Sequence, residues 1–569
     1  AEGPFVDGSE GELVWIPAAG GAFRKVMDAG NYGNAHFTQD TSRIFLNGGG
    51  GALLSVKWDG TDEKTHAKVS GITTYGMSIE GEDFAHNCML SERTASAMEV
   101  NRASNASRVL MSPDGEKALA QINNDIYSMT IPQTGKTVSI SVADASSAQF
   151  PAKKLTDLGG EFPSWSSDSK KIRWALGRFH FEYDLDKSVA FEDSVKSAKK
   201  AQEKAKADSI SKAKTDTVKI KTDAKPKVAK APVKKADDTY KPLEIEIKVY
   251  YEKDIPQSAI LLRGGRIITM KGEEVIANGD VLIENNRIKA VGKSGTLKAS
   301  GAKVVDVSGK TIIPGFVDTH SHMWPQWGIQ KNQVWIYAAN LAYGVTTTRD
   351  PQTATTDVLT YSDMVEAGKM VGPRVYSTGP GVGFWSYNIK DSTGASNALK
   401  QYSKYFNTKY IKMYLTGNRQ SRQWIIKAAK EQQLMPTTEG GLNLKLNITN
   451  MLDGYPGHEH TIPVYPLYND LVKSISYSKM AVTPTLLVSY GGPFAEIYYF
   501  ETEDPYHDKK MQYFMPYEEL AEKTRRVSGW FLPEEHVFQK HAKSMKSMVE
   551  NGSLAGIGSH GEFQGLGYH

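Results

Sequence analysis

The sequence contains a single cysteine, Cys88, among 569 residues. One thiol cannot form an internal disulfide, and it cannot build a zinc finger that depends on several cysteines. No apolar run approaches the roughly 18 residues that a membrane-spanning helix needs. The amino-terminal residues lack the basic and apolar regions of a signal peptide, which is equally consistent with a protein whose leader has been removed.

Length and charge indicate more than one domain. A chain of 569 residues is too long for one hydrophobic core. The net charge of +4 is concentrated in residues 187–241, which hold 16 lysines against 8 acidic residues. That surplus of 8 positive charges leaves the rest of the chain near −4, so the folded parts are mildly acidic.

Residues 1–186 are rich in β-formers and repeat one short pattern. In each copy a polar turn, centred on Asp40, Asp114 or Asp168, precedes a strand and then a second strand. Internal repetition of this kind predicts stacked modules, here the blades of a β-propeller. The pattern resembles the TolB-type repeat, whose Ser-Pro-Asp-Gly turn is intact at Ser112–Gly115. Because this portion suffices for only about four blades, we expect an incomplete propeller.

Residues 187–241 are dominated by alanine, lysine and proline. Such a segment cannot bury enough surface to fold by itself, so we interpret it as a solvated insert or linker. A nucleic-acid-binding segment would combine lysine with arginine or aromatic stacking partners, which this segment lacks. Residues 242–257 follow, and the alternation of Glu244–Tyr250 predicts a strand that returns to the propeller.

A hydrophobic run, Thr311–His322, ends in two histidines two residues apart. On an extended strand alternate side chains share a face, so His320 and His322 point the same way and can reach one metal ion. Asp318 lies one step below on that face. The pattern predicts a metal site at the end of this strand.

The stretch Pro314–His322 resembles the Pro-Gly-Phe-Val-Asp-x-His-x-His signature of the amidohydrolase superfamily, in its imidazolonepropionase and prolidase-like branch. In that family a small β-sandwich precedes a (β/α)8 barrel that carries its metals at the carboxyl-terminal rim. Upstream, Ala259–Met270 and Val281–Gly292 read as short strands that fit the sandwich. Asn285 and Asn286 predict a hairpin turn, because both residues tolerate positive φ.

The resemblance implies a multidomain fold: the partial all-β propeller, a β-sandwich at residues 258–313 and a (β/α)8 TIM barrel at residues 314–569, truncated at its carboxyl terminus. From Phe316 onward strands alternate with segments of helical period. The eight candidate barrel strands are 316–320, 345–349, 374–378, 410–415, 434–438, 457–460, 481–487 and 554–559.

The resemblance also assigns site residues. Lys412 lies where the family carries a lysine that carbon dioxide converts to a carbamate. An ammonium has no lone pair for a cation, so Lys412 could bridge metals only as that anion; the alternative is a barrel lysine that pairs with Asp318 or Glu439. His460 matches the sixth-strand ligand of the family, and His458 shares its strand face as a second candidate.

Two positions depart from the family pattern. The fifth strand has Thr437, a poor ligand, where the family has histidine, and Glu439 on the same face could supply an oxygen ligand instead. In the eighth strand His560 replaces an aspartate, and a neutral imidazole accepts a proton but adds no negative charge. We therefore predict one Zn2+ more readily than two, His560 as catalytic base, and as metal ligands His320, His322, Lys412 (carboxylated), His460 and Glu439.

The favoured interpretation is a hydrolase that cleaves amide or peptide-like C–N bonds of a small molecule or short peptide through a metal-activated water. The alternative is a non-catalytic binding or scaffold protein with a degenerate barrel, and metal content separates the two. A serine peptidase would need a Gly-x-Ser-x-Gly elbow, which the sequence lacks.

By resemblance, TolB-like propellers fused to such barrels are exported bacterial proteins, which predicts a periplasmic or otherwise exported location. We expect no nucleic-acid partner and no transmembrane segment, and an oligomer or second chain would complete the propeller and sandwich. His507, His536 and His541 fall outside the matched strands, and we interpret them as surface or loop residues.

Overall fold

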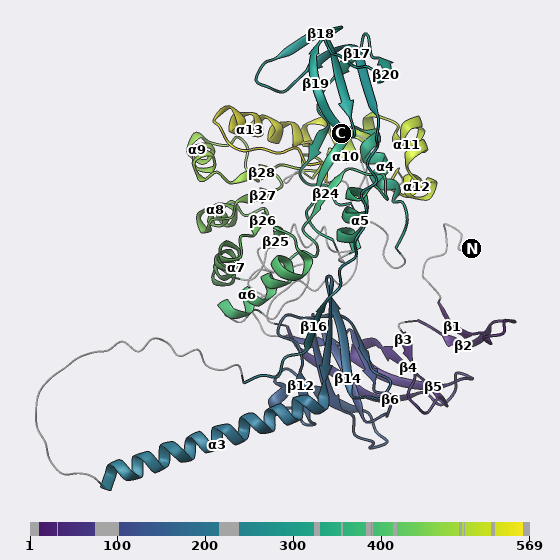
Figure 1. The fold of residues 1–569 in the computed structure, drawn as a ribbon, viewed down its shortest axis with the longest axis vertical. Helices are drawn as coiled ribbons and strands as arrows, with labels where there is room; N and C mark the ends of the chain where they lie inside the picture. The colour runs from purple at the N-terminus through teal and green to yellow at the C-terminus, as the bar shows by residue number, and fades with distance from the viewer. Residues whose placement is uncertain are drawn as a thin grey trace, which may run out of the picture. The chain divides into compact units, whose positions relative to one another are not determined.

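The computed structural model (Figure 1) divides into two compact units, Ala1–Ile72 with Ala103–Ile247, and Thr73–Arg102 with Lys248–His569. The residues that it describes are 11–30, 32–73, 102–215, 238–323, 330–353, 357–382, 389, 391–413, 418–488, 492–493, 495–524 and 530–560. Cys88 and the carboxyl-terminal residues 561–569 lie outside these ranges.

The first unit is built from small, mainly antiparallel sheets with the strand orders β1-β2, β11-β6-β5-β4-β3 with β7 beside β6, β12-β10-β9-β8, and β13-β14-β15-β16. The bounds are β1 Glu12–Trp15, β2 Arg24–Asp28, β3 Gly33–His36, β4 Arg43–Gly48, β5 Ala52–Lys57, β6 Lys64–Thr73, β7 Arg102–Asn105, β8 Arg108–Met111, β9 Lys117–Ile122, β10 Asp125–Thr130, β11 Val138–Ser141, β12 Ala152–Lys154, β13 Glu161–Trp165, β14 Lys171–Leu176, β15 Phe179–Asp184 and β16 Leu243–Glu246.

The repeated polar turns of this unit are held by their aspartates. The Asp114 carboxylate accepts hydrogen bonds from the Ser112 hydroxyl at 2.5 Å and from the Glu116 backbone N–H at 3.1 Å. The carboxylate of Asp168 repeats both bonds one module later, with Ser166 and with the N–H of Lys170. The turns predicted at these aspartates are therefore confirmed, because each carboxylate satisfies the backbone where one strand reverses into the next.

The lysine-rich segment begins as a long helix, α3 (Leu185–Thr215), which the composition did not lead us to predict. Alanine, lysine and glutamate are strong helix formers, so local propensity supplies order without a buried core. Near its start, the Ser188 hydroxyl bonds that of Tyr183 at 2.6 Å. As predicted, the chain then returns to this unit, because β16 pairs antiparallel with β15.

The second unit opens with one mixed sheet of order β19-β18-β17-β20, with β21 also beside β17. Asn285 and Asn286 have φ of 49° and 63° between β18 and β19, which confirms the predicted hairpin turn. The sheet strands described here form a single layer, so the sandwich stays a prediction. The bounds are β17 Ala259–Ile268, β18 Val275–Glu284, β19 Arg287–Lys293, β20 Lys303–Asp306 and β21 Thr311–Ile312.

Asp280 is a buried carboxylate that organises this sheet. It accepts hydrogen bonds from the backbone N–H of Gly264 at 3.0 Å, the Ser294 hydroxyl at 2.7 Å and the N–H of Gly295 at 2.8 Å. Burial raises the pKa of Asp280, but the bonds from Gly295 and Ser294 outweigh it and hold the pKa below its ordinary value.

We expect Asp280→Ala to lower the free energy of unfolding by about 3 kcal/mol at pH 7, because three buried donors lose a charged acceptor. Since the folded pKa lies below the unfolded value of about 3.9, this stabilisation is present above that pH and is lost as pH falls through the folded pKa. Denaturant unfolding at pH 7 and pH 3 measures both effects, with Glu273→Ala, at an exposed carboxylate between β17 and β18, as control. Equal stability of Asp280→Ala and wild type at pH 7 would contradict the assignment.

Seven parallel strands and a short eighth segment close a ring. Strands β22-β23-β24 form one run and β25-β26-β27-β28 another. A bridge between Val382 and Met413 joins the runs, and bridges from the last segment to Val482 and Asp318 close the circle. The strands are β22 Phe316–Asp318, β23 Val345–Asp350, β24 Arg374–Ser377, β25 Tyr410–Met413, β26 Met435–Glu439, β27 Gly457–Glu459 and β28 Ala481–Thr483.

Helices surround these strands (Figure 1). Buried residues of α8, α9 and α13 pack with β28 in one apolar cluster that includes Met451, Ile475, Val482 and Met548. None of the described helices combines the length and apolar character needed to cross a membrane. The bounds are α4 Trp335–Ala342, α5 Asp357–Glu366, α6 Ser392–Lys400, α7 Arg419–Glu431, α8 Leu444–Asp453, α9 Asn469–Ser478, α10 Ala495–Thr502, α11 Lys509–Phe514, α12 Tyr517–Thr524 and α13 Phe538–Glu550.

Candidate functional site

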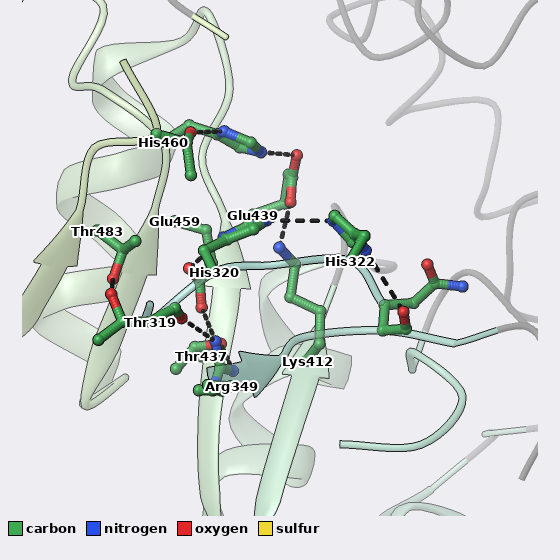
Figure 2. Close-up of polar contacts among 12 residues, drawn as sticks. Thr319, His320, His322, Arg349, Lys412, Thr437, Glu439, Glu459, His460 and Thr483 are labelled. Carbon is green, nitrogen blue, oxygen red and sulfur yellow. Dashed lines mark hydrogen bonds and ion pairs between the residues drawn. The ribbon is translucent and has the colours of Figure 1, made fainter. Parts of the chain in front are cut away.

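Polar side chains from five segments of the ring come together, and Figure 2 labels all of those named below except His560. All are buried, which is unusual for ionisable groups unless they are paired or bind a metal. They include every site residue that the sequence predicted. The residues are His320 and His322 after β22, Lys412 in β25, Glu439 at the end of β26, His460 after β27 and His560 in the last segment.

Three of the imidazoles have Nδ1 engaged by a partner. Nδ1 of His320 bonds the Glu459 carboxylate at 2.6 Å. Nδ1 of His322 lies 3.4 Å from the carbonyl oxygen of Gln352, and Nδ1 of His460 bonds the Thr485 hydroxyl. Partners of this kind fix the ring orientation of metal-binding histidines and leave Nε2 for the metal.

The Nε2 atoms of His320 and His322 face one another at 3.2 Å. If both rings donate Nδ1–H to their oxygen partners, two nitrogen lone pairs meet at this distance and repel. A cation between them relieves the repulsion, and two ligands at about 2.0–2.1 Å in tetrahedral geometry stand roughly 3.3 Å apart. The residues present therefore fit a tetrahedral metal such as zinc.

His560 completes a cluster of imidazoles. Single ring nitrogens of His320, His460 and His560 all lie within 4.8 Å of one another, and all three side chains are buried. The rings of His322 and His560 lie 4.8 Å apart between centroids. His560 is held in place by its backbone, whose N–H donates to the carbonyl of His320 at 2.7 Å. His560, which replaces the expected aspartate, would thus lie within reach of an ion bound to His320 and His460.

Lys412 and His460 both contact Glu439. The Glu439 carboxylate lies 2.5 Å from Nζ of Lys412 and 2.5 Å from Nε2 of His460. Burial raises the pKa of Glu439, but the charges of His460 and Lys412 outweigh it, and the pKa falls well below its ordinary value. Of the two partners considered for an unmodified Lys412, the structure places Glu439 beside it.

Three histidines of the cluster, His320, His322 and His560, are held neutral. Burial, together with the charge of Lys412, lowers the pKa of His320 to about 3. Burial and the neighbouring His320 hold the pKa of His322 well below its ordinary range, and burial with His322 and His320 does the same for His560. Neutral imidazoles keep the lone pairs that a metal requires.

Some expectations need correction. The Asp318 carboxylate accepts the backbone N–H groups of His320 at 3.0 Å and Ser559 at 3.1 Å. It therefore ties the first strand to the last segment. His541 is buried within α13, so its interpretation as a surface or loop residue was wrong, whereas His536 lies in a loop as expected, although it is buried. His458 is also buried, and its ring packs against the backbone of Gly440.

The sequence reasoning missed Arg349 and Glu459. Nη1 of Arg349 contacts the Glu459 carboxylate at 2.7 Å, and Nη2 donates to the Thr437 hydroxyl at 2.6 Å (Figure 2). Burial raises the pKa of Glu459, but the charge of Arg349 and the bond from His320 hold it well below its ordinary value. Glu459 directly precedes the candidate ligand His460 in the sequence, and this position could have indicated that its carboxylate lies near the site.

Comparison with known proteins gives short matches of substantial identity. Dihydroorotase of Trichlorobacter lovleyi is 38% identical over 64 residues, 11% of this chain and 15% of that protein. D-hydantoinase of Streptomyces coelicolor is 44% identical over 69 residues, 12% and 14% of the two chains. Dihydropyrimidinase of Rattus norvegicus is 35% identical over 80 residues, 13% and 15% of the two chains. The chain thus spans about 15% of the length of these curated relatives, and no family model matches it.

These matches show that one short segment of the chain is similar to segments of those enzymes. Among solved structures, a Xaa-Pro dipeptidase with methionine bound in its active site is 16% identical, with a TM-score of 0.39, and the match covers 55% of this chain and 81% of that one. Molinate hydrolase is 15% identical with a TM-score of 0.37, and the match covers 54% and 73% of the two chains. Within the ring, the buried imidazoles stand at the ends of the strands, where (β/α)8 barrels carry their chemistry.

Proposed function

We propose that this chain is a metal-dependent hydrolase of amide or peptide-like C–N bonds. The observation that carries the proposal is the pair of Nε2 atoms of His320 and His322, which face each other at 3.2 Å inside a buried cluster with His460 and His560. Four converging imidazoles without a metal would be a costly arrangement, because buried polar groups destabilise a fold unless they are satisfied.

The residues that would hold the metal are His320, His322, His460, Glu439 and Lys412, with Lys412 as a carbamate and zinc as the metal. Bound there, a divalent cation supplies a Lewis acid that polarises a substrate carbonyl and acidifies water. His560 is our candidate for the base that accepts a proton, because a neutral imidazole among the ligands is placed to receive it.

The charges around the site favour the carbamate. As they stand, Lys412 pairs with Glu439 and Arg349 pairs with Glu459, so these four side chains sum to no net charge. Carboxylation changes Lys412 from one positive to one negative charge. The four side chains then carry two negative charges, which balance one divalent cation, and we infer one metal ion per site.

The repeated turns of the first unit support its assignment as a propeller. We propose that the four-stranded antiparallel sheets of the first unit are blades of a TolB-like propeller. We further propose a periplasmic or otherwise exported location.

A substrate panel tests the proposed reaction. We expect the zinc-loaded chain to hydrolyse compounds from at least one C–N class, either Xaa-Pro dipeptides or cyclic amides such as hydantoins and dihydropyrimidines. Chelator-treated chain, re-supplied with Zn2+, provides the matched control and should lose and regain activity. Stoichiometric zinc without hydrolysis of any amide would overturn the reaction class while leaving the metal site intact.

The non-catalytic alternative rests on the altered positions Thr437 and His560. Placement of His560 within the imidazole cluster favours a working site over a degenerate one. A wild-type chain that takes up no zinc after dialysis against the metal would favour the scaffold.

A further inference from the structure

One chain of contacts crosses the ring from Thr437 to the imidazole cluster (Figure 2). The Thr437 hydroxyl accepts from Arg349, Arg349 pairs with Glu459, and Glu459 bonds Nδ1 of His320, at 2.6, 2.7 and 2.6 Å. The four residues come from four different strand ends, those of β26, β23, β27 and β22. No member other than His320 was predicted as a ligand.

We propose that Arg349 and Glu459 are positioning residues that fix the ring orientation and tautomer of His320, and that Thr437 serves to orient Arg349. The proposal deepens the proposed function, since it concerns the same site. Glu459, as a carboxylate, accepts only from a protonated Nδ1, which leaves the lone pair of His320 on Nε2.

Arg349 suits this role because its guanidinium is a rigid planar fork. One arm neutralises the buried charge of Glu459, whose side chain is only 1% exposed, and the other arm reaches Thr437. Nη1 also lies 3.4 Å from the carbonyl oxygen of Thr319, the residue that precedes His320. Arg349 thus holds both the carboxylate that bonds His320 and the backbone beside it.

The chain of contacts from Thr437 through Arg349 and Glu459 to His320, which we call the relay, also accounts for the threonine at position 437. A histidine there would have to take the space and the acceptor that Arg349 uses, so Thr437→His should disrupt the relay and weaken zinc binding. If position 437 were instead an abandoned ligand site, the same substitution would restore a ligand and tighten binding. The two interpretations therefore predict opposite changes in the zinc affinity of Thr437→His.

The first experiment reads the tautomer in the metal-free chain by nitrogen-15 NMR of the histidine rings. We expect His320 to be held as the Nδ1–H tautomer in the wild type and to become a mixture in Glu459→Gln, because a glutamine amide can donate as well as accept. The double variant Arg349→Met with Glu459→Gln guards against misfolding, because it removes both buried charges together. An unchanged tautomer in every correctly folded variant would overturn the proposal.

The second experiment measures zinc affinity by competition with a chelator, with no activity readout. We expect Glu459→Gln to bind zinc about 10 to 100 times more weakly. Thr437→Val and Thr437→His should also bind more weakly, while Thr437→Ser, which keeps the hydroxyl, should match the wild type.

Thr483→Val is the matched control for the second experiment. Its hydroxyl bonds that of Thr319 at 3.2 Å and has no part in the relay, so zinc affinity should be unchanged. Tighter zinc binding by Thr437→His, or wild-type affinity in Glu459→Gln, would overturn the relay. The outcome is separate from that of the substrate panel: amide hydrolysis can fail while the relay stands, and the relay can fail while hydrolysis is observed.

Discussion

A chain in which His320 and His322 are both replaced by alanine should hold no zinc and should hydrolyse amides no faster than a protein-free control. The reason is geometric. These two rings present the facing Nε2 atoms at 3.2 Å, and their loss leaves too few nitrogen ligands on one side of the cluster. Metal analysis of the dialysed protein, with wild type expected at about one zinc per chain, measures the effect directly.

His507→Ala is the control for the double variant, because His507 is an exposed histidine that pairs with Asp504 outside the cluster. It should keep its zinc and its activity. Since alanine at two buried positions can also destabilise the barrel, circular dichroism must show that the double variant is folded. A folded double variant that retains stoichiometric zinc would contradict the site assignment.

Lys412→Ala should also lose activity, and small carboxylates should restore part of it. Lys412 is fully buried and contacts Glu439, so the alanine variant leaves a space within the site. If the lysine acts as a carbamate, formate or acetate can enter that space and supply the missing anionic oxygen ligand. Assays across a concentration series of each carboxylate measure the rescue.

Lys409→Ala, at an exposed position just before β25, is the control and should behave like the wild type. Rescue of Lys412→Ala by carboxylates but not by short alkylamines supports the carbamate. The reverse pattern, with alkylamines restoring activity, would show that the lysine acts as an ammonium paired with Glu439.

The sequence was sufficient to predict the ring because the patterns that mark its strands and helices are local in the chain. Strand segments such as 345–349 and 434–438 coincide with β23 and β26 to within one residue, since alternation and flanking helical periods mark them without tertiary information. The pairing of His320 and His322 followed from strand geometry in the same way, and the facing Nε2 atoms agree with it.

The relay was not predictable because its partners lie far apart in sequence. Glu459 is 139 residues from His320 and 110 residues from Arg349. Simple alternation would also place Glu459 on the face opposite His460. The strand ends at Glu459, however, and His460 has a φ of 70°. The alternation of side chains along a strand therefore no longer determines which way the His460 side chain points.

Two further differences have local physical causes. The helix α3 was missed because the segment was interpreted from its inability to bury apolar surface, whereas alanine and lysine favour a helix even without burial. His541 was taken for a surface or loop residue because it lies outside the matched strands, and that position alone did not reveal that its side of α13 is buried.

The proposed chemistry requires a single metal ion between the imidazoles of the barrel. Anomalous diffraction at the zinc edge from zinc-loaded crystals tests it most directly. The account predicts one peak about 2.0–2.2 Å from Nε2 of both His320 and His322, on the side that faces His460 and Glu439. A structure with zinc in the solvent and no peak at this cluster, or with the peak elsewhere in the chain, would contradict it.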